Sequence, residues 1–159
     1  MTESFLKVQS LIQTSTTTSV ELTIDTYPQK LLATSQSLIN DGHYSISVVV
    51  AHMACEFRVE RALSTAFAYK GLEYLEASVI GFLNGYNLGG NNKICKLYMA
   101  LTNDPVNRQP FWQEFKDSTK RRNGIVHGGK VVDQIEADKS YQAASALIAH
   151  LDQQCSRLG

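Results

Sequence analysis

Hydrophobic residues recur along most of the chain at the spacing of helices, and the longest such segment covers residues 44–69. It contains no glycine or proline, and its first half, up to Cys55, is apolar on nearly every side. A helix that is apolar all round is expected at the centre of a protein rather than on its surface. The β-branched cluster at 46–50 would also suit a buried strand, but the length of the whole segment favours a helix.

Five further segments, separated by turn residues, also favour helices. Residues 28–39 begin at Pro28, which suits a first helical turn, and end before the turn sequence Asn-Asp-Gly. The other four segments are 72–86, 91–103, a helix that begins near Phe111 and runs into residues 120–129, and 134–158, which is rich in strong helix formers. The pattern predicts an all-α bundle of about five to six helices.

The first 27 residues follow a different pattern. Residues 13–20 are polar and β-branched, and residues 20–27 alternate between apolar and polar positions like a short strand. A single strand does not make a stable sheet on its own. We therefore predict an N-terminal arm over residues 1–27, either mobile or a β-strand that pairs with something else, followed by a helical domain over residues 28–159.

Composition and charge limit the classes of partner. Fifteen Lys and Arg residues balance fifteen Asp and Glu residues, so any contact with nucleic acid or anionic lipid must come from a local patch. No apolar stretch approaches the ~18 residues of a membrane span, and the start has no signal-peptide pattern. The three distant cysteines form neither a disulfide framework nor a metal-binding pair. We expect a reduced, soluble, cytoplasmic protein with no membrane contact.

Candidate chemistry is concentrated in residues 111–130. Arg122 falls in an otherwise apolar stripe with Phe111, Phe115 and Val126, where a guanidinium needs a carboxylate, a phosphate or a water-filled cleft. Over residues 116–130, five lysine and arginine side chains stand against one aspartate, which makes a local basic patch. Gly124 costs about 1 kcal/mol inside a helix, so we expect the helix to loosen there.

A purely structural explanation of this stretch is also open, because lysine, arginine, histidine and a glycine pair are typical of a helix C-terminus. Against it stands Glu56, which directly follows the apolar half of segment 44–69 and needs a cation in turn. Arg122 is its predicted partner. For Glu60 we expect an exposed ion pair with Arg58 or Arg61. His52 could join Glu56 in binding a metal, but no third ligand is in sight.

At these residues the sequence resembles a known family. Residues 122–129, "RNGIVHGG", resemble the Arg-x4–6-His motif of HEPN domains (higher eukaryotes and prokaryotes nucleotide-binding), in which a polar residue, often asparagine, follows the arginine. Residues 38–63 are similar to the second helix of that family, where a small-residue and apolar segment leads into a glutamate. The resemblance spans about residues 28–155.

The resemblance implies an up-and-down helical bundle that dimerises so that two motifs face one cleft. Many members are metal-independent endoribonucleases of toxin–antitoxin and other defence systems, and others only bind. It implies no metal and no cofactor, and as partners RNA, a second copy of the chain, and an antitoxin or a nucleotidyltransferase-type protein. Carried over, Arg122 and His127 would be catalytic, Asn123 would orient them and Glu56 would hold Arg122 in place.

These residue types suit RNA cleavage by its own 2′-hydroxyl, which leaves cyclic phosphate ends. Histidine can transfer the proton near neutral pH, and arginine can stabilise charge on the phosphorane. Lys120, Arg121 and Lys130 are expected to grip flanking phosphates. The motif has one histidine per chain, His127, which is a physical reason to expect a homodimer.

We therefore predict an endoribonuclease of HEPN type, and the alternative is a non-catalytic HEPN module that binds RNA, a nucleotide or a partner protein. A nucleotidyltransferase or other small-molecule enzyme is less favoured, because no glycine-rich phosphate loop or paired-aspartate motif occurs. Residues 88–93, "LGGNNK", are interpreted as a turn before a helix.

Overall fold

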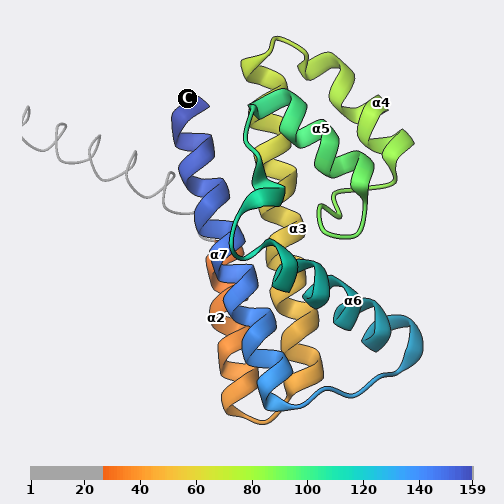
Figure 1. The fold of residues 1–159 in the computed structure, drawn as a ribbon, viewed down its shortest axis with the longest axis vertical. Coiled ribbons are helices and arrows are strands. Elements are labelled where there is room, and N and C mark those ends of the chain that lie inside the picture. Colours follow the sequence, from red (N-terminus) through yellow and green to blue (C-terminus); the bar gives the residue numbers. More distant parts are fainter. Residues whose placement is uncertain (1–26, 159) are drawn as a thin grey trace, which may run out of the picture.

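The computed structural model describes residues 27–158, and this part of the chain is an up-and-down bundle of six α-helices without a strand (Figure 1). The predicted all-α fold and the number of helices are confirmed. The predicted arm lies outside the described residues except for Tyr27, which begins the first helix. The helices are α2 (Tyr27–Asn40), α3 (Tyr44–Tyr69), α4 (Glu73–Leu83), α5 (Asn92–Thr102), α6 (Trp112–Gly128) and α7 (Gln134–Leu158), and a 3-10 turn, η1, covers Val106–Arg108.

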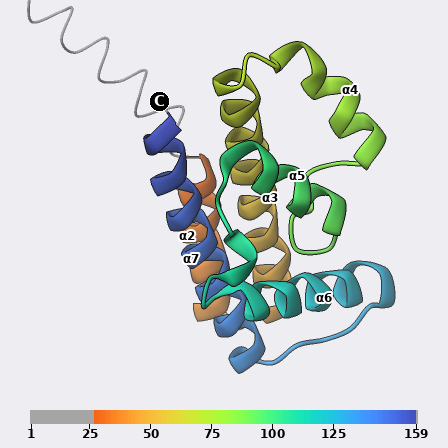
Figure 2. The ribbon, with the colours of Figure 1, turned by 45° about the horizontal axis from the view of Figure 1, so that its top comes forward.

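The helices α2, α3 and α7 make the body of the bundle. α2 and α3 form an antiparallel hairpin, closed by a turn in which Gly42 has a φ of 81° and the His43 N–H donates to the Leu38 carbonyl at 2.7 Å. α7 packs along both of these helices, while α4 and α5 lie against the later half of α3 (Figure 1). α6 crosses the bundle, and its far end points away from it (Figure 2).

α3 is the central helix, as its sequence predicted. Twelve of its 26 residues are buried, and it contacts α2, α4, α5, α6 and α7. The cluster at 46–50 is helical, so the alternative of a buried strand is wrong. Small side chains dominate its buried positions, including Ala51, Ala54, Ala62 and Ala66, and α7 contributes Ala143 and Ala144 to the same core. Small residues on both helices let α3 and α7 approach closely.

Two helix ends differ from the prediction. α4 ends at Leu83 rather than at residue 86, because Asn84 takes the left-handed conformation (φ 64°) and Gly85 follows with φ 102°. α6 runs through Gly124 without a break, so the expected loosening there is wrong. The helix ends where Gly129 turns left-handed (φ 64°) and the Lys130 N–H donates to the Gly124 carbonyl at 3.0 Å.

A buried polar cluster fixes the connection between α5 and α6. The carboxylate of Asp104, which is buried, accepts a hydrogen bond from the Tyr98 hydroxyl at 2.8 Å. The same oxygen lies 2.7 Å from His150 Nε2 on α7. Since a buried carboxylate requires such partners, this cluster ties the connection to α7 and so determines where α6 leaves the bundle.

None of the helices among residues 27–158 combines the length and the apolar character that crossing a membrane requires.

Candidate functional site

The apolar stripe predicted along α6 exists only in its first half. Phe115 is buried in the main core, whereas Val126 is 49 % exposed. A second, smaller core cluster near the α2–α3 turn contains Ile39, Val48, Val132 and Ala137, and Ile125 rather than Val126 packs against it. The prediction fails at Val126 because the far end of α6 leaves the bundle, so only one residue of its last turn reaches the core.

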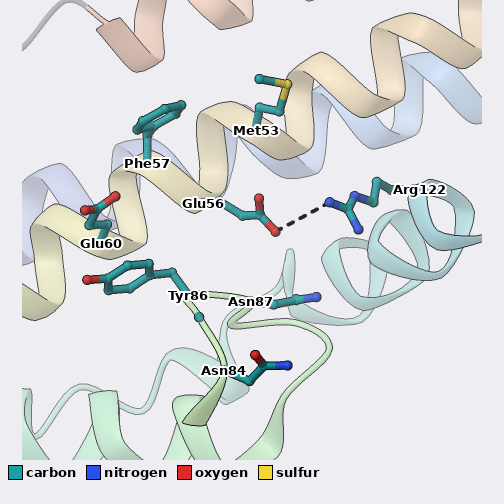
Figure 3. Close-up of a pocket in the computed structure, with 9 residues that line it drawn as sticks. Met53, Glu56, Phe57, Glu60, Asn84, Tyr86, Asn87 and Arg122 are labelled. Carbon is teal, nitrogen blue, oxygen red and sulfur yellow. Dashed lines mark ion pairs between the residues drawn. The ribbon is translucent and has the colours of Figure 1, made fainter. Parts of the chain in front are cut away.

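Arg122 lies where α6 passes α3, and it faces Glu56 as predicted (Figure 3). Its Nη2 is 3.9 Å from Glu56 Oε1, within ion-pair range but too far for a hydrogen bond. Its Nη1 donates to Oδ1 of Asn123 at 3.0 Å. Its Nε is buried and has no hydrogen-bond partner among the described residues. The guanidinium, with five N–H donors, is therefore held in place but poorly satisfied.

His52 lies behind this ion pair. Its ring is 2 % exposed, stacks on Phe115 and places Nε2 3.4 Å from Glu56 Oε1. The alignment is too poor for a hydrogen bond, so neither ring nitrogen has a hydrogen-bond partner among the described residues. The neighbouring His52 ring, and to a lesser degree Arg122, lower the pKa of Glu56 against the opposing effect of its partial burial. Glu56 is therefore ionised at neutral pH.

Glu56 and Arg122 form one end of a pocket of about 550 Å³, between α3, α6 and the loop that joins α4 to α5 (Figure 3). Sequence reasoning missed the contribution of this loop, although its Asn-Gly-Tyr-Asn sequence is a clear turn signal rich in polar side chains. The pocket is lined by Met53, Glu56, Phe57 and Glu60 of α3, Asn84, Gly85, Tyr86 and Asn87 of the loop, and Arg122 of α6.

The loop is held firmly against the helices. Leu88 is buried in the core, and Gly89 approaches α6 so closely that a Cβ there would lie 2.5 Å from Thr119 Oγ1. Asn91 begins α5 as a side-chain cap, since its Oδ1 accepts from the Lys93 N–H at 2.9 Å. The predicted turn at 88–93 is thus confirmed, and it also fixes the position of the pocket wall.

His127 lies outside this arrangement. It is exposed near the end of α6, does not line the pocket, and makes no hydrogen bond or ion pair with any other residue in 27–158. Residues five apart on an α-helix point about 140° away from each other. One chain therefore brings Arg122, Asn123 and Glu56 together, and His127 is not part of that group.

Arg121, predicted to bind RNA, is largely engaged inside the protein. Its side chain is 14 % exposed and lies 2.6 Å from Glu114 and 3.7 Å from Glu136 of α7. It also donates to Ser140 Oγ of α7 at 3.2 Å. These contacts show Arg121 as a residue that joins α6 to α7.

The other two predicted phosphate contacts are more accessible. Lys120 is well exposed and pairs with Asp117 at 2.8 Å, while Lys130 lies 3.7 Å from Glu136. Glu56 of α3 and Glu136 of α7 thus face the basic stretch. The charge count over residues 116–130 did not include these two carboxylates. The basic patch is weaker than its sequence indicated.

Two further expectations concern α3. Arg58, one of the two expected partners of Glu60, instead forms an ion pair with Asp152 of α7, and Glu60 lines the pocket. His52 and Glu56 have no third metal-type ligand beside them, and no group of three or more His, Cys, Asp or Glu side chains suited to a metal ion occurs between residues 27 and 158.

Comparisons with known proteins do not assign the chain to a family. No family model matches it, and neither a curated protein nor a solved structure matches it significantly. The resemblance to HEPN domains therefore stays a prediction from the motif.

Proposed function

We propose that the protein is a metal-independent endoribonuclease of HEPN type that acts as a homodimer. The observation that carries the proposal is the state of Arg122, which Glu56 and Asn123 orient beside a pocket while its buried Nε has no hydrogen-bond partner among residues 27–158. A phosphate group offers the oxygens that such a guanidinium requires. Asn87 supports this use, because Gly90 N–H occupies its Oδ1 and leaves its amide N–H₂ as a further donor.

In this proposal the RNA 2′-hydroxyl attacks the neighbouring phosphorus, and the 5′-oxygen of the next nucleotide leaves. The products are a 2′,3′-cyclic phosphate and a 5′-hydroxyl. In this step the His127 imidazole takes the proton of the 2′-hydroxyl and then returns it to the leaving oxygen, while Arg122 stabilises the charge on the phosphorane. Because His127 does not line the pocket of its own chain, the proposal assigns it to the pocket of the second chain in a twofold dimer.

The alternative is a non-catalytic module of the same family that binds RNA, a nucleotide or a partner protein. Two observations favour it: His127 lies outside the pocket, and Glu56 and Glu60 together outnumber the single cation of the lining. A pocket of that charge suits recognition of a ligand better than stabilisation of a highly charged transition state.

The test compares the wild type with His127→Ala and Arg122→Ala on structured RNAs in EDTA, with fragment ends and oligomer mass recorded in the same preparations. We expect a loss of about 10²–10⁴-fold for His127→Ala and a comparable loss for Arg122→Ala. The matched controls His43→Ala and Arg108→Ala remove exposed residues of the same types elsewhere and should cleave like the wild type.

If all these proteins are folded and dimeric and none cleaves RNA, the non-catalytic module is the better proposal. Cleavage that persists in both site variants would place the activity outside residues 122–127.

A further inference from the structure

The end of the pocket away from Arg122 has a different chemistry. Tyr86 of the α4–α5 loop lies at this end with Glu60 near it, whereas the Phe57 ring lies at the rim and points away from Tyr86 (Figure 3). Phe57 is 39 % exposed, and an edge-to-face contact with Tyr27, at 4.9 Å between ring centroids, holds its ring there. The partly exposed Tyr86 ring is thus the stacking platform for a flat ring at this end.

The size and charge of the pocket restrict what that ring can belong to. A volume of about 550 Å³ suits a small molecule or one nucleotide unit. Two carboxylates against one guanidinium disfavour a polyphosphate, since its several negative charges would meet like charges. A single base that carries one phosphate suits these limits, with the phosphate at Arg122 and the base against Tyr86.

We propose that this end of the pocket binds an unpaired guanine of the RNA through the carboxylate of Glu60; the inference rests on the proposed function. A carboxylate only accepts hydrogen bonds, and its two oxygens match two parallel N–H donors. Guanine presents two such donors side by side, N1–H and N2–H. Adenine, cytosine and uracil each place an acceptor next to their donor on that edge, and this acceptor would face a carboxylate oxygen.

The surroundings of Glu60 agree with that role. Burial raises the pKa of Tyr86 and the negative charges of Glu60 and Glu76 raise it further, so its ring stays neutral. The charge of Glu60 therefore acts on the same aromatic wall that would stack on the base. Base–aromatic stacking contributes about 1–3 kcal/mol per base without selecting among bases. The selectivity for guanine is then assigned to Glu60, and the stacking affinity to Tyr86.

The experiment measures binding of guanosine, adenosine, cytidine and uridine 3′-monophosphates by calorimetry. For the wild type we expect guanosine monophosphate to bind about 5- to 150-fold more tightly than the others, the range of one bidentate contact. Glu60→Gln should abolish this preference, and Tyr86→Ala should weaken all four nucleotides alike. The control Glu73→Gln, an exposed change on α4, should leave the preference unchanged. Equal binding of the four nucleotides, or a preference that survives Glu60→Gln, overturns the inference.

Cleavage of single-stranded oligonucleotides that contain one guanine, adenine, cytosine or uracil separates this inference from the proposed function. Cleavage that requires His127 but ignores the base keeps the endoribonuclease and removes the guanine site. A guanine preference that requires Glu60, in a protein that cleaves no RNA, keeps the guanine site and removes the catalytic proposal.

Discussion

Replacing Gly89 with alanine tests whether the pocket wall is placed as described. A Cβ at this position would lie 2.5 Å from Thr119 Oγ1 and 2.8 Å from Phe115 Cε1, closer than side-chain atoms approach one another. Neither neighbour can withdraw freely: the Phe115 ring is buried in the core, and the buried Thr119 hydroxyl donates to the Phe115 carbonyl at 3.1 Å. The added methyl must therefore push the loop away from α6.

Overpacking of this kind costs about 1–3 kcal/mol of unfolding free energy. At roughly 2–4 °C per kcal/mol for a chain of this size, Gly89→Ala should lower the Tm by about 2–12 °C in a calorimetric scan. The matched control is Gly81→Ala in α4, where a Cβ meets nothing within 4 Å. Alanine is the better helix former by up to about 1 kcal/mol, so this control should keep the Tm or raise it.

Partial rescue is also expected, because Thr119→Ala in the Gly89→Ala chain removes the nearer of the two clashing atoms. A Gly89→Ala protein that melts at the wild-type temperature would refute the close packing of the loop on α6. The position of Tyr86 and Asn87 in the pocket would then be wrong as well.

Three further predictions follow from the ion pairs. Because the pKa of Glu56 is lowered in the fold, its charge stabilises the protein above the unfolded pKa of about 4.3, and this contribution is lost as the pH falls through the folded pKa. In urea titrations from pH 3 to 7, Glu56→Gln should be less stable than the wild type at pH 7, and its stability should depend less on pH. Parallel stability curves for the two proteins would contradict this. His150→Ala leaves the buried Asp104 side chain without its α7 partner but with its Tyr98 hydrogen bond, so the unfolding free energy should fall by about 1–3 kcal/mol in urea denaturation. A loss below about 1 kcal/mol would mean that water replaces the imidazole. Arg121→Met should lower the free energy of unfolding by about 1 kcal/mol and leave the rate of RNA cleavage within a few-fold of the wild type. Loss of cleavage with an unchanged free energy of unfolding would instead make Arg121 an RNA contact.

The helices could be predicted from the sequence because local signals specify them. The segments 44–69 and 134–158 match α3 and α7 at both ends, since periodicity, good helix formers and flanking turn residues all agree there. α4 was predicted too long because Asn84 and Gly85 were taken as part of a helix. An asparagine followed by glycine is a common place for the left-handed conformation that ends one.

The site was predictable only where a single residue conflicted with its surroundings. A guanidinium and a carboxylate, each beside an apolar run, had to find partners, and Arg122 and Glu56 indeed face each other. Nothing local indicated that Tyr86 and Asn87 would join them, because the close approach of Gly89 to α6 depends on the packing of the whole bundle. The pairing of Arg121 with Glu136 was missed for the same reason.

The separation of Arg122 from His127 leads to a direct test of how a site would be assembled. Arg122 lines the pocket, whereas His127 is exposed about one and a half turns further along α6. If the two act on one phosphate, the histidine is expected to come from a second chain. Mixing inactive Arg122→Ala and inactive His127→Ala proteins then forms mixed dimers with one intact composite site.

With random exchange of chains, half of the dimers are mixed and each has one working site of two, so activity should return to about a quarter of the wild type. Sites built within one chain would stay inactive in every mixture, because each chain lacks one of the two residues. A mixture that stays inactive, although mass spectrometry shows that mixed dimers have formed, would therefore place Arg122 and His127 in the same chain's site. It would also require α6 to rearrange when RNA binds, since its helical geometry keeps the two side chains apart.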